Sequence, residues 1–197
     1  MAAHGSFVLA TRNAHKLAEF RRLLEPVGIS VQSLPNEVEL APENARTFQG
    51  NALPKARCAA AATNCAALAD DSGIESEVLG GAPGVRSARY AGAGASDAQN
   101  LEKLVRDVPA GSALRYVCAL AYVDPRTGHE RVFIGECRGR LADAPRGSRG
   151  FGYDPVFLPD ADGQHRTMAE LTERQKDAIS HRGNAVRALI EWLCGQS

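Results

Sequence analysis

The segment at residues 11–16 has the residue types and the position of a phosphate-binding turn. It follows a short apolar run and opens a stretch of helical periodicity. The start of a helix presents backbone N–H groups and the positive end of the helix dipole, and both favour a phosphate. Lys16 would add a positive charge from the first helical turn. The structural alternative is a capped helix with a surface lysine.

A pair of adjacent carboxylates offers a place for a metal ion. Asp70 and Asp71 follow an apolar run and precede Ser72 and Gly73, so we expect them at the end of a strand. Adjacent carboxylates repel, and burying them is costly unless a cation compensates. Mg²⁺ takes hard oxygen ligands and suits carboxylates that face a phosphate. The structural alternative is a solvated Asp-Asp turn.

A second carboxylate ligand could come from the polar loop that precedes an Ala-rich segment. This loop contains Glu37, Glu39 and Glu43. Their spacing alone does not distinguish them. The sequence therefore indicates a possible two-carboxylate site whose second member is open.

Residues 150–155 combine features that suit a nucleotide base. Two glycines alternate with Phe151 and Tyr153, and Asp154 follows. Aromatic faces can stack on a base, and glycines allow the backbone to approach it closely. The structural alternative is a turn whose aromatic rings pack in the core.

A polar group near the C-terminus could recognise the edge of a base. Lys176 and Ser180 are four residues apart in a segment with helical periodicity, so they should share a face, and His181 and Arg182 follow. Because arginine carries only hydrogen-bond donors, Arg182 could contact a keto oxygen. The structural alternative is a charged helix surface.

The elements that must position these residues follow from hydrophobic periodicity and capping residues. A helix should begin after Asn13 and end before Pro26, and another should begin at Ser96. An Ala-rich helix over residues 47–64 is either started or kinked by Pro54, and one long helix covers residues 172–194. The predicted strands cover residues 6–11, 29–34, 66–69, 114–123 and 131–137, the last two forming a hairpin. Helices that alternate with strands, together with a hairpin, indicate an α/β fold with a mixed sheet.

Length and composition exclude several classes of protein. The chain has 197 residues, which fits a single domain over residues 1–197, and 23 basic residues balance 23 acidic ones. A net charge of zero argues against a polybasic nucleic-acid binder. No signal peptide or membrane-spanning segment is expected. The five cysteines form no C-x-x-C pair, which is typical of reduced thiols in the cytoplasm.

Four blocks of this sequence resemble the dITP/XTP pyrophosphatase family, also called inosine triphosphate pyrophosphatases. They are VLATRNAHK at residues 8–16, TFQGNALPK at 47–55, ADDSGIESEVLGGAPGVRSARYAG at 69–92, and FGYDPVF at 151–157 taken with AELTERQKDAISHR at 169–182. The resemblance implies a long, twisted mixed sheet flanked by helices, with two lobes around a central nucleotide cleft. It also implies a cytoplasmic homodimer that hydrolyses dITP, ITP and XTP to the monophosphate and pyrophosphate.

The resemblance also implies a role for each matching residue. Asp71 corresponds to the family's catalytic base, and the resemblance implies that Asp71 and Glu43 are Mg²⁺ ligands. Ala45 stands where a glycine is common in the family. The implied substrate-binding residues are Thr11, Arg12, Asn13, Ala14, His15, Lys16, Lys55, Ser72, Phe151, Gly152, Tyr153, Asp154, Lys176, His181 and Arg182.

Two rival functions are compatible with parts of this pattern. One is a Maf-like pyrophosphatase that acts on modified pyrimidine triphosphates, which the FGYD and SHR blocks disfavour. The other is a nucleotide sensor without catalysis, which the presence of Asp71 and Glu43 disfavours.

Overall fold

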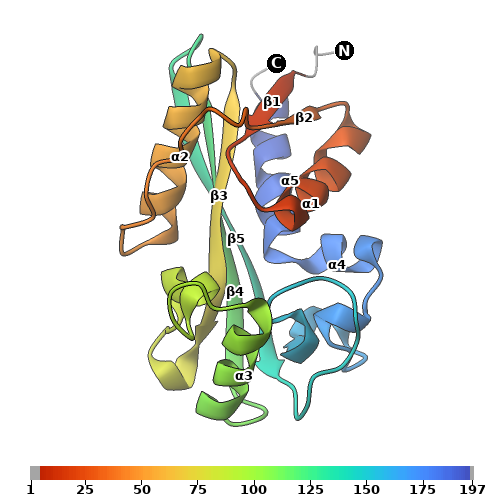
Figure 1. Ribbon diagram of the computed structural model, residues 1–197. Helices are drawn as coiled ribbons and strands as arrows, with labels where there is room; N and C mark the ends of the chain where they lie inside the picture. Colours follow the sequence, from red (N-terminus) through yellow and green to blue (C-terminus); the bar gives the residue numbers. More distant parts are fainter. Residues whose placement is uncertain (1–4, 196–197) are drawn as a thin grey trace. The chain divides into compact units, whose positions relative to one another are not determined.

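The computed structural model describes residues 5–195 and has an α/β fold (Figure 1). Six strands form one sheet in the order β2-β1-β3-β4-β5-β6. β1 pairs in parallel with β2 and with β3, whereas β5 and β6 are antiparallel, so the sheet is mixed. This confirms the fold class expected from the sequence.

The described elements are close to those predicted, with additions. The strands are β1 (Ser6–Leu9), β2 (Ser30–Ser33), β3 (Ala67–Ser76), β4 (Ala113–Asp124), β5 (His129–Leu141) and the short β6 (Phe157–Pro159). The α-helices are α1 (Ala14–Leu24), α2 (Phe48–Thr63), α3 (Asp97–Asp107), α4 (Glu173–Ile179) and α5 (His181–Cys194). Six short 3-10 helices and β6 were not predicted, because elements of three to six residues are too short to show a clear periodicity.

The chain divides into two compact units. Within the described chain, unit 1 comprises residues 5–71, 118–135 and 185–195, and unit 2 comprises residues 72–117 and 136–184. The core of unit 1 is built on Phe7, Leu9, Phe20, Leu68 and Leu189, and that of unit 2 on Ile74, Leu104, Leu114, Tyr116 and Phe157.

Local capping explains where the helices begin. The Asn13 side chain accepts hydrogen bonds from the backbone N–H groups of His15 and Lys16 at 2.9 and 3.2 Å, which caps α1 as predicted. Thr47 caps α2, and Pro54 lies inside this helix and does not start it. Ser96 caps α3 through a capping box with Gln99.

Two predicted boundaries are wrong. β3 continues to Ser76, so Asp70 and Asp71 lie inside a strand and not at its end, because neighbouring polar groups stabilise the buried acids. The predicted C-terminal helix is broken at Ser180, whose backbone is extended (φ −68°, ψ 156°). The Ser180 hydroxyl accepts from Gly183 N–H at 3.1 Å, since serine favours a helix start over a helix interior. Lys176 and Ser180 therefore do not share one helix face.

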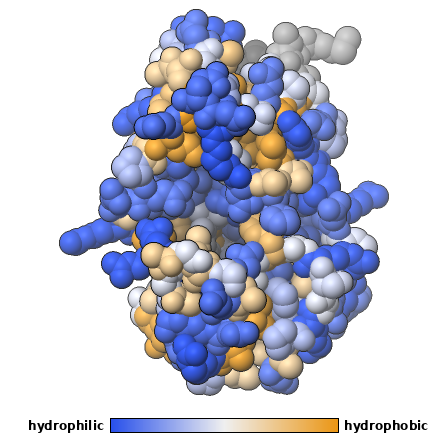
Figure 2. Space-filling view, in the orientation of Figure 1, coloured by the Kyte–Doolittle hydropathy of each residue, from blue (hydrophilic) through white to orange (hydrophobic). Residues whose placement is uncertain are grey.

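The visible molecular face is mostly hydrophilic, with apolar side chains in small patches (Figure 2). Within residues 5–195, no helix is long and apolar enough to cross a bilayer. All five cysteines are free thiols, as expected.

Candidate active site

Unit 1 contains a group of three acids and two lysines, which we call the acid cluster: the buried Asp70, Asp71 and Lys55 with the partly exposed Glu43 and Lys16. Its centre is Asp71, which is only 5% exposed. α2 lies along the first half of β3 (Figure 1), and Asn51 on α2 donates from its Nδ2 to Asp71 Oδ2 at 2.9 Å. This bond fixes one carboxylate oxygen and directs the other, Oδ1, away from Asn51.

Lys55 ties the acids of this cluster together. Its Nζ donates to Glu43 Oε1 at 2.6 Å and to the backbone oxygen of Asp70 at 2.7 Å, and it lies 4.0 Å from Asp71 Oδ1. Lys55 is 4% exposed, so its charge acts mainly on these partners.

Asp70 and Lys16 form a second contact within the acid cluster. Lys16 Nζ lies 3.0 Å from Asp70 Oδ1. Lys16 extends from the first turn of α1, so the helix start and the acids meet at this contact. The strand-to-helix junction and the carboxylates, which the sequence suggested separately, are thus part of one group.

Burial raises the pKa of Asp71 above its ordinary value. The hydrogen bond from Asn51 and the charge of Lys55 act in the opposite direction, while the charge of Glu43 raises the pKa further. A carboxylate whose pKa is raised accepts a proton more readily, which suits a general base.

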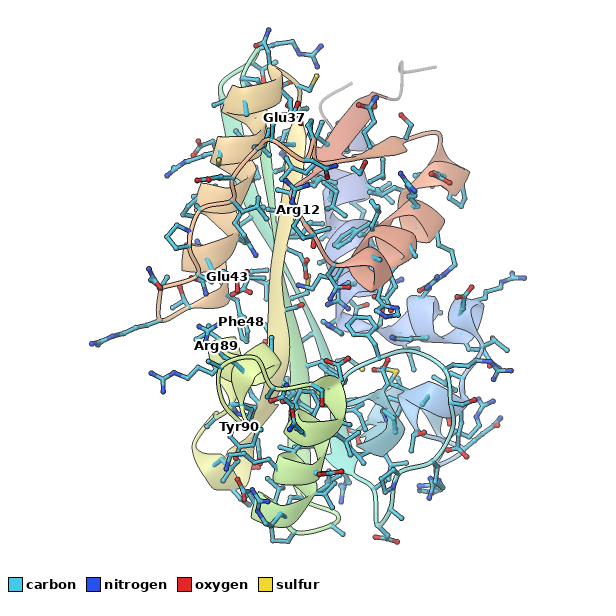
Figure 3. The ribbon with its side chains drawn as sticks, viewed as in Figure 1. Arg12, Glu37, Glu43, Phe48, Arg89 and Tyr90 are labelled. Carbon is cyan, nitrogen blue, oxygen red and sulfur yellow. The ribbon has the colours of Figure 1, made fainter. Side chains whose placement is uncertain are left out.

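The structure distinguishes the three glutamates that the sequence left open. Glu43 contacts Lys55, and its charge acts on Asp71. Glu37 lies apart from Glu43, nearer the other end of the loop that precedes α2 (Figure 3). The backbone oxygen of Glu39 accepts from the thiol of Cys58 at 2.9 Å. Glu43 is therefore the member of this set that lies in the acid cluster.

The loop that carries Glu43 is held by Asn51. Asn51 Oδ1 accepts from the backbone N–H of Ala45 at 2.8 Å, so one amide binds both the loop and Asp71. Among the described non-glycine residues, only Asn64 and His165 have positive φ, so Ala45 has no conformational need for a glycine.

Arg12 is engaged with the protein backbone. Its guanidinium donates to the carbonyl oxygens of Leu34, Pro35, Asn36 and Val38 at 2.8–3.2 Å. Five donors in a planar fork suit such a set of acceptors. Arg12 therefore stabilises the loop after β2 through these hydrogen bonds. Thr11 contributes in a similar local way, since its hydroxyl accepts from Asn13 N–H at 3.1 Å.

Unit 2 holds the residues suggested for base recognition. Arg182 is 4% exposed and donates to the Ser72 hydroxyl at 2.7 Å. Its guanidinium carbon lies 5.3 Å from the centre of the Phe151 ring, and Lys176 Nζ lies 5.1 Å from the same centre. Two cations therefore lie within the range of a cation–π interaction with the Phe151 ring.

The two aromatics of the FGYD segment have different roles. The Tyr153 side chain is buried in the core of unit 2, and its hydroxyl donates to Ser87 O at 2.7 Å. Phe151 is only partly buried. Of the two, Phe151 is thus the ring that could stack on a base, and Tyr153 supports the loop.

Asp154 organises the FGYD loop from inside. Its Oδ2 accepts from Lys176 Nζ at 2.6 Å and from Phe151 N–H at 3.0 Å. Gly150 has φ +75°, and a Cβ there would collide with the Asp154 carboxylate, so both its backbone conformation and the space require glycine. The other loop glycine, Gly152, donates its N–H to Asp97 at 2.9 Å.

Sequence reasoning missed two residues of these groups. Asn51 is a polar residue in an Ala-rich helix, and this unusual composition was the available signal. Tyr116 lies in an apolar strand, where nothing marks it. It stacks on His181 with ring centres 4.6 Å apart and an interplanar angle of 9°.

The acid cluster fits a hard divalent cation. Three carboxylates exceed two lysines by one negative charge, and Asp71 Oδ1 and Glu43 both lie around Lys55 Nζ. Within residues 5–195, no group of three or more His, Cys, Asp or Glu side chains is arranged to hold a metal. A pair of carboxylates matches Mg²⁺, which is commonly bound by one or two carboxylates together with waters and substrate phosphates.

Comparisons with known proteins agree across the chain. The Ham1 family matches residues 7–192. The dITP/XTP pyrophosphatase of Frankia alni is 51% identical over 197 residues, covering 94% of this chain and 96% of that protein. That of Cutibacterium acnes is 48% identical over 191 residues, covering 93% of each. The structure of a HAM1 protein from Coxiella burnetii superposes with a TM-score of 0.83 at 39% identity, covering 96% of this chain and 98% of that one. This chain is therefore a member of the Ham1 family.

Proposed function

We propose that this protein is a nucleoside triphosphate pyrophosphatase that hydrolyses the deaminated purine nucleotides dITP, ITP and XTP. The products are the nucleoside monophosphate and pyrophosphate, so the reaction removes aberrant purines from the nucleotide pool. The observation that carries this proposal is the acid cluster, in a chain whose relatives are named dITP/XTP pyrophosphatases.

Asp71 is the proposed general base. Its carboxylate accepts the proton of a water whose oxygen attacks the α-phosphorus. The bond between the α-phosphorus and the bridging oxygen breaks, and its electron pair leaves with pyrophosphate. The raised pKa and the fixed orientation of Asp71 support this role.

Mg²⁺ is the proposed cofactor, with Glu43 and Asp71 as its protein ligands. When bound, it would neutralise charge on the triphosphate and lower the pKa of a bound water. Lys55 sets the spacing of these two carboxylates through its contacts with both.

The start of α1 is the proposed phosphate-binding element. Phosphoryl transfer is catalysed mainly by positioning and by electrostatic stabilisation of the developing charge. Lys16 is more exposed than Lys55, and its charge lies in the first turn of α1, at the positive end of the helix dipole. Thr11, Asn13, Ala14 and His15 complete this element. Arg12 contributes by holding the loop after β2.

Unit 2 is proposed to select the base. Deamination of adenine replaces a 6-amino donor by a 6-keto acceptor, so a site lined with donors favours hypoxanthine and xanthine. Arg182 is the leading donor and bonds Ser72, while Lys176 lies near the Phe151 ring and His181 directly precedes Arg182 in the chain. A site built to bind an acceptor leaves buried donors unpaired when adenine occupies it, which penalises the wrong base.

The remaining proposals concern the setting of the enzyme. We propose that residues 1–197 act as one pyrophosphatase domain, that two chains form a homodimer, and that the protein works in the cytoplasm on free nucleotides. The balanced charge and the free thiols support this setting, because they suit neither a polybasic nucleic-acid binder nor a disulfide-stabilised protein. Mass measurement of the native protein in solution tests the dimer.

The test of the reaction compares the wild-type chain with Asp71→Asn. Pyrophosphate release is measured from dITP, XTP, dATP and dTTP at saturating Mg²⁺. The wild type should prefer dITP and XTP, and Asp71→Asn should lower kcat by roughly 10²–10⁴ while the protein remains folded. Preference for dTTP would favour a Maf-like activity, and absence of turnover with retained nucleotide binding would favour a sensor.

A further inference from the structure

Tyr116 contacts two parts of the proposed base-recognition group, namely the start of α5 at His181 and the Phe151 loop at Asp154. It is 6% exposed on β4, and its ring stacks on the His181 imidazole with ring centres 4.6 Å apart. On another side, its ring centre lies 4.5 Å from that of Phe157. The ring is therefore immobilised against the first residue of α5.

The hydroxyl of Tyr116 contacts the Phe151 loop through Asp154. It donates to Asp154 Oδ1 at 3.2 Å. The other oxygen of the same carboxylate binds Lys176 Nζ and the Phe151 N–H. Burial and the charge of Asp154 hold the pKa of Tyr116 well above its usual value, so the hydroxyl stays protonated and remains a donor.

The Tyr116 side chain thus joins the start of α5 to the Phe151 loop, which is distant from α5 in sequence. The stacked ring positions His181, and with it the neighbouring Arg182 at the start of α5. The hydroxyl orients Asp154, which in turn sets the Phe151 loop and the Lys176 ammonium. Phe151 and Arg182 face each other at 5.3 Å, so their separation depends on both supports.

We propose that Tyr116 is a positioning residue for base selection, and that its hydroxyl sets the Phe151 loop relative to Arg182. This inference rests on the proposed function, because it assumes that unit 2 reads the base. Tyr116 is assigned no contact with substrate. It acts through Asp154 and His181.

The test is Tyr116→Phe, which keeps the stacked ring and removes only the hydroxyl. Tyr122→Phe is the matched control. Tyr122 is on the same strand and is also 6% exposed, and burial together with the charge of Asp124 raises the pKa of its hydroxyl, but it belongs to the core of unit 1. Both variants lose a hydroxyl that faces a carboxylate, so a general loss of stability affects them alike.

The readouts are kcat and KM for dITP and dATP, together with calorimetric titration by inosine and adenosine monophosphates. Because only part of the energy of a hydrogen bond to a charged group reaches the base, we expect about a three- to tenfold effect. Tyr116→Phe should raise KM for dITP and lower the dITP-to-dATP ratio of kcat/KM by that factor, with kcat changed less. Tyr122→Phe should leave the ratio unchanged.

The outcomes separate this inference from the proposed reaction. If Tyr116→Phe keeps the wild-type ratio, or if Tyr122→Phe changes it equally, the positioning role is wrong. If the wild type prefers inosine monophosphate but does not hydrolyse dITP, the reaction is wrong and the binding arm still decides the role of Tyr116. Should Tyr116→Phe not fold, Tyr116→Met replaces it, since a flexible methionine fills the buried position without a hydroxyl. The same loss of preference is then expected, and an unchanged preference overturns the inference.

Discussion

Replacing Asn51 by alanine should damage both stability and catalysis, because one amide joins Asp71 to the loop that carries Glu43. Asn51 is 1% exposed, accepts from Ala45 N–H at 2.8 Å, and donates to Asp71 at 2.9 Å. A hydrogen bond to a charged group contributes about 1.5–3 kcal/mol and a neutral one about 0.5–1.5 kcal/mol. We therefore expect the free energy of unfolding to fall by about 2–4 kcal/mol.

The catalytic effect of Asn51→Ala should exceed what lost stability explains. Groups that orient metal ligands typically contribute 10–100-fold to metal affinity or activity. Without Asn51, the Glu43 loop and the Asp71 carboxylate each lose the bond that fixes their separation. We therefore expect pyrophosphate release from dITP to fall by roughly 10–100-fold and to require more Mg²⁺.

Asn100→Ala is the matched control for this prediction. Asn100 is a second buried asparagine, 2% exposed, and it also makes two hydrogen bonds, from Ala91 N–H at 2.8 Å and to Ala88 O at 3.2 Å. Both partners are backbone groups of unit 2 and neither belongs to the acid cluster. Its loss should cost about 1–3 kcal/mol of stability and leave the Mg²⁺ requirement unchanged.

The assay pairs unfolding with turnover on the same preparations. Trp192 is the single tryptophan and packs against Tyr122 and Phe133 in unit 1, so its fluorescence reports urea unfolding there. Turnover is measured well below the melting temperature of every variant. If Asn51→Ala keeps wild-type activity and Mg²⁺ dependence, or if Asn100→Ala loses as much, the reasoning is refuted.

Three further predictions follow from the same structure. Arg12→Ala should destabilise unit 1 by about 1–3 kcal/mol. Arg12→Lys should not restore the stability, because one ammonium group cannot replace the several donors of a planar guanidinium. Full rescue by lysine in urea unfolding would contradict this. The pKa values of all four tyrosines are raised in the folded protein, that of Tyr90 to about 12. The unfolded chain therefore loses its tyrosine protons at lower pH than the folded chain, and the free energy of unfolding should fall as pH rises above about 10. Tyrosinate absorbance that appears in the folded protein near pH 10 would contradict this. Burial raises the pKa of Cys137 to about 12, so a thiol reagent should label the exposed Cys65 and Cys194 rapidly and Cys137 only on unfolding, as peptide mass mapping would reveal.

The sequence predicted the helix starts well, because a helix start depends on residues that are close together in the chain. Asn13 and Ser96 cap their helices because the capping bond joins residues two or three positions apart. The strand boundaries failed where the outcome depends on distant partners. β3 continues through Asp70 and Asp71 because Lys16, Lys55 and Asn51, all remote in sequence, stabilise buried charge that would otherwise end the strand.

In the candidate site, too, the residue types could be recognised from the sequence, whereas the contacts between distant residues could not. Residue types indicated a helix start with a lysine and, separately, an acid pair, and the structure joins them through the contact of Lys16 with Asp70. Spacing did not separate Glu43 from Glu37 and Glu39, because the choice depends on how a loop folds against α2. The engagement of Arg12 with four carbonyls and the stacking of Tyr116 on His181 depend on tertiary contacts alone.

The most direct test of the proposed reaction is hydrolysis of dITP in water enriched in heavy oxygen, with Mg²⁺ and the wild-type chain. Products are separated and their masses determined. Attack on the α-phosphorus predicts one heavy oxygen in deoxyinosine monophosphate, an equal amount of unlabelled pyrophosphate, and a much slower reaction with dATP. Heavy oxygen in pyrophosphate, release of single phosphate groups, or equal rates with dATP would contradict the account.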